Sequence, residues 1–193
     1  MKTLLIIGSD SASSWLAKKL ESEKNINVAI YKDKSGGIRR IIKLIKSGRI
    51  TLLALINLIV AETLRKKEKA QFDGAITSNK DIKKLISELN PDRLLCFRCG
   101  LIINKDIINS GLPVYNIHVS DLPRFPGLGT IWRSIKEQAW AQNACLHHID
   151  EGIDTGTVLL KKKYTMMPHL SYKKNEDIAY LAGIDLALEF LEN

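Results

Sequence analysis

The chain reads TLLIIGSDS from Thr3 to Ser11, and the pattern of this stretch recurs along the first half of the sequence. The first five residues are continuously apolar, which predicts a strand at residues 3–7 buried on both faces of a sheet. A glycine and three polar residues follow, and residues of this kind form turns and cap helices. We expect a helix over residues 12–24, because an apolar residue recurs at every fourth position from Ala12 to Leu20.

The turn between this strand and helix is a candidate anion site. Free backbone N–H groups at a helix N-terminus attract phosphate, so we expect Gly8, Ser9 and Ser11 to contact an anionic part of a substrate. The turn has neither the G-x-G-x-x-G nor the Walker spacing of established phosphate-binding loops. A strand–helix turn without a ligand explains the same residues and stays open as the alternative.

The strand–turn–helix unit recurs up to residue 97. Apolar runs predict three further strands, at residues 27–31, 73–77 and 93–97. A helix is expected at residues 80–89, where Ser78 or Asn79 can cap its start. Strands that alternate with helices form a parallel sheet with right-handed crossovers. We therefore predict an α/β fold, a Rossmann-like and mostly parallel sheet with helices on both faces.

The second half of the chain extends this sheet. Strands are expected from Val114 to His118, at residues 143–149 and at residues 157–164. A short helix is expected at residues 130–137 and an amphipathic closing helix at residues 175–191. The predicted inner face of the closing helix comprises Ile178, Leu181, Ile184, Leu188 and Leu191. With 193 residues the chain is long enough for one domain with its own core, so we expect a single domain over residues 1–193.

The basic residues are concentrated in one block. Residues 32–69 hold eleven Lys and Arg against three Asp and Glu, and this difference equals the net charge of the whole chain, +8. We expect a basic helical insertion at about residues 36–70, with helices over residues 38–46 and 50–69. Its uncharged apolar run, Ile50–Ala61, is shorter than the roughly 20 residues that span a bilayer.

The partner of this insertion is open. We favour packing of its apolar run against the sheet or against a second subunit, which would make a homodimer. Its basic flanks could instead give a weak contact with an anionic membrane surface, attract phosphate groups, or form a solvated face. We expect no nucleic acid among the partners.

The cysteines predict a cytoplasmic protein without a metal. Cys96, Cys99 and Cys145 are odd in number and lack the spacing of a disulfide framework, which indicates a reducing compartment. The first twenty residues do not have the pattern of a signal peptide. The C-x-x-C spacing of Cys96 and Cys99 has no second pair to complete a zinc site.

The residues with catalytic potential follow the strand that ends at His118. Asn116 and His118 are two positions apart in that strand, so their side chains point to the same face. A loop rich in proline and glycine follows, and the segment EGIDTG then contributes Asp154. An amide, an imidazole and a carboxylate can together move a proton and stabilise an oxyanion.

These residues resemble a known family, the formyltransferases that use 10-formyltetrahydrofolate. The shared pattern is N-I-H-P-S-L-L-P, a glycine-rich loop, and D-x-G-x-D-T-G. Here NIHVSDLPRFPGLGT begins at Asn116 and IDEGIDTG begins at Ile149. The match is specific over residues 93–163 and generic before residue 91. Val119 and Asp121 depart from the family pattern close to the catalytic histidine and could reshape its pocket.

The resemblance implies acyl transfer from the formylated folate to an amine. Asn116 would donate its amide N–H to the oxyanion. His118 would donate to the oxyanion or shuttle the amine proton, and Asp154 would orient the imidazole and favour its charged form. His147 and Ser120 are further candidates for contacts with the amine substrate. His147 and His148 are adjacent, so at most one of them faces the site.

The resemblance also implies a folate site, with 10-formyltetrahydrofolate as co-substrate and no metal. Its pterin ring would lie between the loop after the fourth strand, at Phe97 and Arg98, and the segment before the catalytic aspartate. That segment comprises Ile149, Asp150 and Glu151.

Three branches of the family differ in their amine. We favour the sugar N-formyltransferases, which act on a nucleotide-linked amino sugar for surface polysaccharide such as lipopolysaccharide, because the basic insertion resembles proteins of that kind. Glycinamide ribonucleotide formyltransferases of purine synthesis are the alternative. Methionyl-tRNA formyltransferases add a C-terminal tRNA-binding domain, which we do not expect here. A formyltetrahydrofolate hydrolase and a non-catalytic folate- or nucleotide-binding module also stay open.

Overall fold

The structure is a computed structural model that describes residues 1–36 and 51–192. The helix expected at residues 38–46 lies outside these described residues, and so does the start of the helix expected at residues 50–69.

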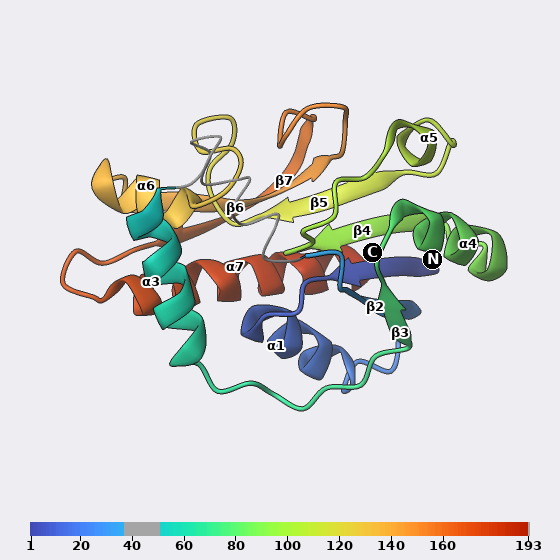
Figure 1. The fold of residues 1–193 in the computed structure, drawn as a ribbon, viewed down its shortest axis with the longest axis horizontal. Coiled ribbons are helices and arrows are strands. Elements are labelled where there is room, and N and C mark those ends of the chain that lie inside the picture. The colour runs from blue at the N-terminus through green and yellow to red at the C-terminus, as the bar shows by residue number, and fades with distance from the viewer. Residues whose placement is uncertain (37–50, 193) are drawn as a thin grey trace.

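The core of the protein is a seven-stranded sheet in the order β3-β2-β1-β4-β5-β6-β7 (Figure 1). Five neighbouring strands are parallel: β1 (Thr3–Ile7), β2 (Val28–Asp33), β3 (Gly74–Ile76), β4 (Arg93–Phe97) and β5 (Val114–His118). Two antiparallel strands complete the sheet, β6 (Ala141–His148) and β7 (Val158–Thr165). The predicted mostly parallel α/β sheet is confirmed.

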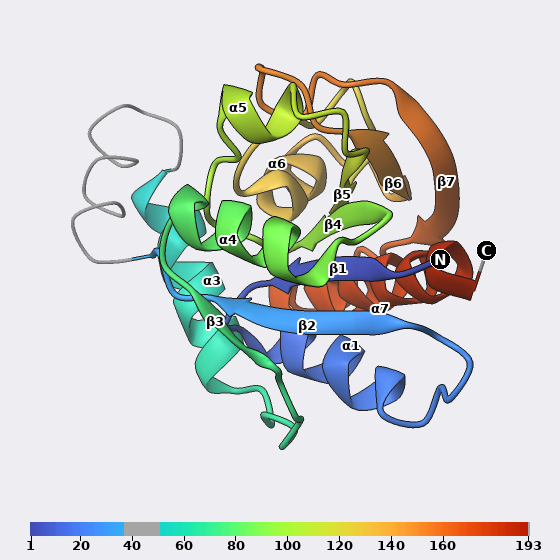
Figure 2. The same cartoon turned by 90° about the vertical axis from the view of Figure 1, so that its right-hand side faces the viewer.

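Helices cover both faces of this sheet (Figure 2). Helices α1 (Ser11–Leu20) and α7 (Tyr172–Glu192) pack on one face, over a core that includes Leu5, Phe97 and Ile184. Helices α4 (Asn79–Leu89) and α5 (Lys105–Ile108) cover the other face, and α6 (Thr130–Lys136) follows the loop after β5. Helix α1 ends four residues before the predicted end, because residues 21–25 are all polar and have no face to bury.

The prediction for the inner face of α7 is wrong at Leu181, which is 45% exposed. The buried face of this helix includes four small residues, Ala179, Ala182, Gly183 and Ala187, which let its backbone come close to the sheet. A Cβ atom on Gly183 would lie 2.8 Å from Cγ1 of Val119 and 3.0 Å from Cε2 of Phe97. The close approach at Gly183 therefore fixes α7 against the carboxyl ends of β4 and β5, where the candidate site lies.

The apolar run of the basic block forms α3 (Leu52–Thr63), which stands beside α7 in Figure 1. We expected this run to be buried against the sheet or against a second subunit. Only Ala54 and Ala61 of α3 are buried within the chain, so its large side chains do not pack against the sheet, and packing against a second subunit stays a prediction. Among the described residues, no helix combines the length and the apolar character needed to cross a bilayer.

Candidate active site

Strand pairing brings three of the candidate side chains together. Asn116 and His118 lie at the carboxyl end of β5, and the antiparallel register with β6 places His147 directly beside Asn116. His147 is buried, whereas His148 points to the other face and packs its ring 4.8 Å from that of Tyr115. His147 is therefore the histidine of the adjacent pair that joins the site.

Asp154 is the residue at which these side chains meet. Its Oδ2 lies 3.2 Å from Nδ1 of His118, and its Oδ1 lies 3.4 Å from both Nε2 of His147 and Nδ2 of Asn116. The Gly127 N–H also donates to Oδ2, at 2.7 Å. Asp154 has a φ of +56°, which non-glycine residues adopt rarely and mostly at functional sites.

Both ring nitrogens of His118 face hydrogen-bond acceptors. Nε2 lies 2.7 Å from the carbonyl oxygen of Phe125, and Nδ1 faces the Asp154 carboxylate. Only the charged imidazolium can donate to both. Burial nevertheless lowers the pKa of His118, and the attraction of Asp154 and Phe125 for the charged form offsets this effect only in part. The resting imidazole is therefore neutral near pH 7 and ready to accept one proton.

The partners of Asp154 keep its carboxylate charged. Burial alone would raise its pKa, but the contacts of the carboxylate with His147 and His118 and the hydrogen bond from the Gly127 N–H together hold the pKa below its ordinary value. The aspartate is thus a fixed negative charge beside an imidazole that can become positive, which is the arrangement of a general base and its orienting partner.

The orientation of Asn116 follows from His147. The Nδ1–H of His147 donates to the backbone oxygen of His148 at 2.7 Å, so its Nε2 is free to accept. Nδ2 of Asn116 lies 3.1 Å from this Nε2. The second N–H of the same amide has only the longer contact with Asp154, at 3.4 Å, and is therefore available to an oxyanion.

Two adjoining cavities lead away from His118. The smaller, of about 100 Å³, contains His118, Tyr172 and Glu176 in its lining together with residues 127–131. The larger, of about 310 Å³, lies among α1, α3 and α7 and is lined in part by Asp10, Glu62 and Arg65. Leu58, Arg98 and Tyr180 line both cavities.

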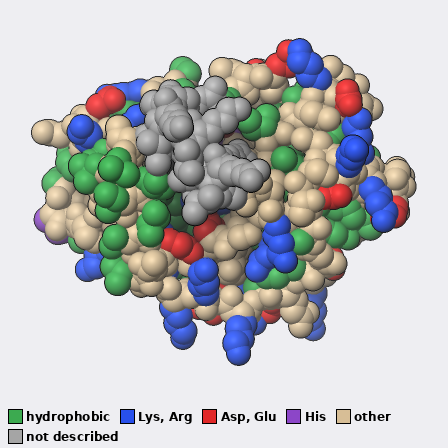
Figure 3. Space-filling model, in the orientation of Figure 1, with side chains coloured by type: hydrophobic (Ala, Val, Ile, Leu, Met, Phe, Trp, Pro, Cys, Tyr) green, Lys and Arg blue, Asp and Glu red, His purple; other side chains and the backbone are tan. Residues whose placement is uncertain are grey.

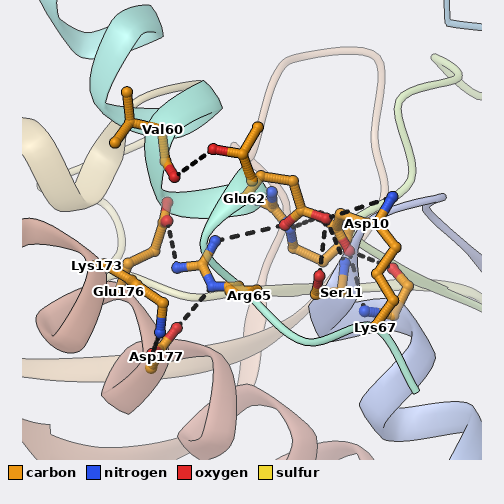
Figure 4. Close-up of polar contacts among 12 residues, drawn as sticks. Asp10, Ser11, Val60, Glu62, Arg65, Lys67, Lys173, Glu176 and Asp177 are labelled. Atoms are coloured by element: carbon orange, nitrogen blue, oxygen red, sulfur yellow. Dashed lines mark hydrogen bonds and ion pairs between the residues drawn. The ribbon is translucent and has the colours of Figure 1, made fainter.

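The turn predicted to bind an anion is occupied by protein groups (Figure 4). The N–H and the hydroxyl of Ser11 both donate to Oε1 of Glu62, at 2.9 Å. The Gly8 N–H donates to the Phe97 carbonyl, and the Ser9 hydroxyl donates to the Asp33 carbonyl. A carboxylate from α3 therefore stands where we expected an anionic substrate group.

Phe97 and Arg98 point away from the segment with which they were expected to form a folate site. Phe97 is fully buried beneath α7, and Arg98 donates from Nε to Oδ2 of Asp10 at 2.7 Å. Ile149 packs against the core on the opposite face of the sheet. Glu151, on the same segment, forms an ion pair with Lys105 at 2.6 Å. Asp150 accepts hydrogen bonds from the Gly152 N–H and the Thr155 hydroxyl.

Ser120 and Asp121 shape the loop after β5 rather than line the cavities. The Ser120 hydroxyl is buried and donates to Oγ1 of Thr130 at 2.7 Å. Oδ1 of Asp121 accepts from Lys161 and from Asn143, both at 2.9 Å. The negative charge of Asp121 is thus balanced by Lys161 of β7, and Asn143 of β6 donates a further hydrogen bond to its carboxylate.

A buried ion cluster beside the larger cavity was not predicted from the sequence. Arg65 donates from Nε to Asp177 at 2.6 Å and from Nη2 to Glu176 at 2.7 Å, and its side chain is only 1% exposed (Figure 4). Burial opposes the charge of Arg65, but the two carboxylates outweigh burial and raise its pKa. In the sequence Arg65 opens a basic run for which a solvated face was one of the alternatives left open, and its two closest partners, Glu176 and Asp177, are more than a hundred positions away.

The described residues contain no group of three or more His, Cys, Asp or Glu side chains arranged to hold a metal ion. Cys96 is buried in β4, and Cys99 contacts Asp33 and the Leu101 carbonyl.

Comparison with known proteins identifies the relatives of this chain. The family model described as "Formyl transferase" matches residues 9–179. The methionyl-tRNA formyltransferase of Rickettsia rickettsii is 29% identical over 116 residues, which is 60% of this chain and 38% of that protein. For the enzyme of Rickettsia canadensis the identity is 30% over 110 residues, 56% of this chain and 36% of that protein. The chain thus spans less than half the length of these curated relatives.

Solved structures share the fold. A sugar N-formyltransferase from a Shewanella species has a TM-score of 0.67 at 16% identity, covering 100% of this chain and 69% of that one. Phosphoribosylglycinamide formyltransferase from Bacillus halodurans has a TM-score of 0.69 at 17% identity, and the match covers 99% of this chain and 94% of that one.

Proposed function

The chain belongs to the formyl transferase family, and we propose that it transfers a formyl group from 10-formyltetrahydrofolate to a primary amine. One observation carries this proposal. Asn116 and His118, at the carboxyl end of β5, each lie within 3.4 Å of the Asp154 carboxylate. Their states are those the reaction needs: a neutral base, a fixed carboxylate and an amide N–H left for an oxyanion.

The proposed step begins with attack of the amine nitrogen on the formyl carbon. A C–N bond forms, and the carbonyl oxygen becomes an oxyanion that the free N–H of Asn116 stabilises. His118 takes the proton that the amine loses, and Asp154 stabilises the resulting imidazolium. The oxyanion then collapses, the bond from the formyl carbon to N10 of the folate breaks, and His118 returns the proton to N10.

For the folate we propose the segment after β4 together with residues 149–151. Leu101 and Ile149 are both partly buried against the same hydrophobic core, which supports a shared surface between these two segments. Asp33 accepts the N–H groups of Gly100 and Leu101 at 2.7 Å each, so the backbone after β4 has a defined shape. Backbone groups of Phe97 and Arg98, rather than their side chains, would contribute to this site.

For the acceptor we propose a nucleotide-linked amino sugar. The carboxylates of Asp10, Glu62 and Glu176 line the cavities next to His118 and suit the hydroxyl groups of a sugar. The alternative, glycinamide ribonucleotide, carries a phosphate group. A nucleotide-linked sugar carries phosphate groups as well, and Glu62 at the α1 N-terminus weighs against a phosphate of either acceptor at that position. Methionyl-tRNA is a further candidate because of the curated relatives.

We propose that the reaction takes place in the cytoplasm, in keeping with three free cysteines.

The test is release of tetrahydrofolate from 10-formyltetrahydrofolate by the purified chain, with each amine in turn and with none. Release that depends on an amino sugar is the expected result. Release only with glycinamide ribonucleotide or only with methionyl-tRNA would reassign the acceptor, and release without an amine would indicate a hydrolase.

The variant His118→Ala tests the catalytic role of His118. Loss of turnover with retained folate binding would support this role, whereas unchanged turnover would contradict it.

A further inference from the structure

The outer face of α3 is an apolar stripe. It consists of six large side chains, five on the helix and one at its C-cap, that are 48–67% exposed: Leu52, Leu53, Ile56, Ile59, Val60 and Leu64. Their spacing of three and four positions places them on one side of the helix. Figure 3 shows hydrophobic side chains gathered at the surface over the position of α3. A contiguous exposed apolar surface of this kind marks an interaction site.

The inner face of α3 and the residues that follow hold the helix to the protein by charge. Glu62 binds Ser11 of α1, and Arg65 binds Asp177 of α7 (Figure 4). A surface helix ordinarily buries its apolar face and exposes its polar face. Here only two small apolar residues of α3, Ala54 and Ala61, are buried, and the large apolar side chains of the stripe are exposed.

The charge around the stripe indicates what covers it. None of the six side chains is charged, and the helix is followed by four exposed residues, Lys66, Lys67, Glu68 and Lys69, with a net positive charge. The chain as a whole carries a net charge of +8. Two copies of so basic a chain repel one another, whereas an anionic lipid surface attracts each copy and accepts apolar side chains between its headgroups.

We infer that α3 docks on an anionic membrane surface, lying parallel to it with the stripe inserted among the lipids and the lysines on the headgroups. The twelve residues of α3 are too few to span a bilayer but enough to lie in its interface. Ile59 of the stripe and its neighbour Leu58 line the larger cavity. Docking therefore places the mouth of that cavity at the membrane surface.

Co-sedimentation of the full chain with vesicles tests this inference. The wild-type chain is expected to sediment with vesicles of mixed phosphatidylglycerol and phosphatidylcholine at low salt, and binding is expected to weaken at high salt. Ile56→Asp and Leu53→Asp should each lower the apparent affinity about tenfold or more, because each replaces an inserted apolar side chain by a charge. The matched control is Leu181→Asp on α7, a similarly exposed leucine outside the stripe, which should bind like the wild type.

Three results would overturn the inference. The first is no binding of the wild type to anionic vesicles at low salt, and the second is equal binding of Ile56→Asp and the wild type. The third is a dimer in analytical ultracentrifugation that Ile56→Asp dissociates while vesicles bind neither protein, because the stripe would then belong to a second copy. Thermal unfolding of each variant checks that it folds.

Discussion

Nδ1 of His118 lies 3.2 Å from Oδ2 of Asp154, and both side chains are largely buried. A neutral imidazole can donate through only one nitrogen. It therefore leaves without a donor either the Asp154 carboxylate or the carbonyl oxygen of Phe125, which faces Nε2. Protonation satisfies both acceptors at once. The site is therefore built to stabilise the imidazolium that forms when an amine gives up its proton.

Asp154→Asn tests the charge of the carboxylate while keeping its size. We expect formyl transfer to fall about 100-fold or more, because the imidazolium loses its counter-charge and one of the two acceptor oxygens at position 154 is replaced by an N–H donor. Steady-state release of tetrahydrofolate measures the effect. Asp185→Asn, an exposed aspartate on α7, is the control and should retain wild-type activity. Similar losses in both variants would contradict the assigned role.

The pH dependence of the reaction tests His118 as the base. Burial lowers its pKa below the ordinary 6.5, and the base acts in its neutral form. The rate under saturating substrate should therefore rise as the pH increases through a value below 6.5 and then level off. Replacing Asp154 by Asn removes the charge that favours the imidazolium, so the midpoint should move to lower pH. A midpoint above 6.5 in the wild type would exclude this assignment.

Local patterns predict the elements of this fold well because their physical causes are local. Strands β1 and β4 begin and end at the predicted residues, since a strand buried on both faces is continuously apolar. Helix α4 begins after Ser78, whose capping box with Asp81 is contained within four residues. Asn116 and His118 share a face for the same local reason, the alternation of side chains along a strand.

The orientation of α3 could not be predicted in this way. Its apolar residues occur on most sides of the helix, so periodicity does not select the buried face. The selection comes from the ion pair between Arg65 and Asp177, which are 112 positions apart. Likewise, no local pattern indicates that the carboxylate of Glu62 accepts a hydrogen bond from the N–H of Ser11, 51 positions away. The parts that escaped prediction depend on contacts between charged side chains distant in sequence.

Arg65 is predicted to contribute strongly to stability. Arg65→Met leaves the buried carboxylate of Glu176 without its cation, and we expect the free energy of unfolding to fall by about 3–5 kcal/mol. Urea unfolding measures this change. Lys67→Met is the matched control. Lys67 is 65% exposed and its ion pair with Glu62 is long, at 4.0 Å, so its replacement should change stability little.

A second substitution separates the charge from the packing of Arg65. If the unpaired carboxylate causes the loss, adding Glu176→Gln to Arg65→Met should recover part of the stability. A double variant that is no more stable than Arg65→Met would show that the lost packing of the arginine side chain dominates instead.

Gly183 is predicted to set the distance between α7 and the end of β5. Gly183→Ala places a Cβ atom 2.8 Å from Cγ1 of Val119, so neighbouring side chains must shift. We expect a loss of about 1–3 kcal/mol in the free energy of unfolding, the usual cost of overpacking a core. Gly36→Ala, which meets nothing within 4 Å, is the control and should change stability by less than about 0.5 kcal/mol. Val119→Ala removes the nearest contact, so it should relieve part of the loss when combined with Gly183→Ala. If the effects of the two substitutions on stability were strictly additive, the contact would not be the cause.

Val119 directly follows His118, so the double variant should also change the turnover. We expect a larger change than the loss of stability alone explains, and formyl-transfer assays well below the unfolding temperature would detect it.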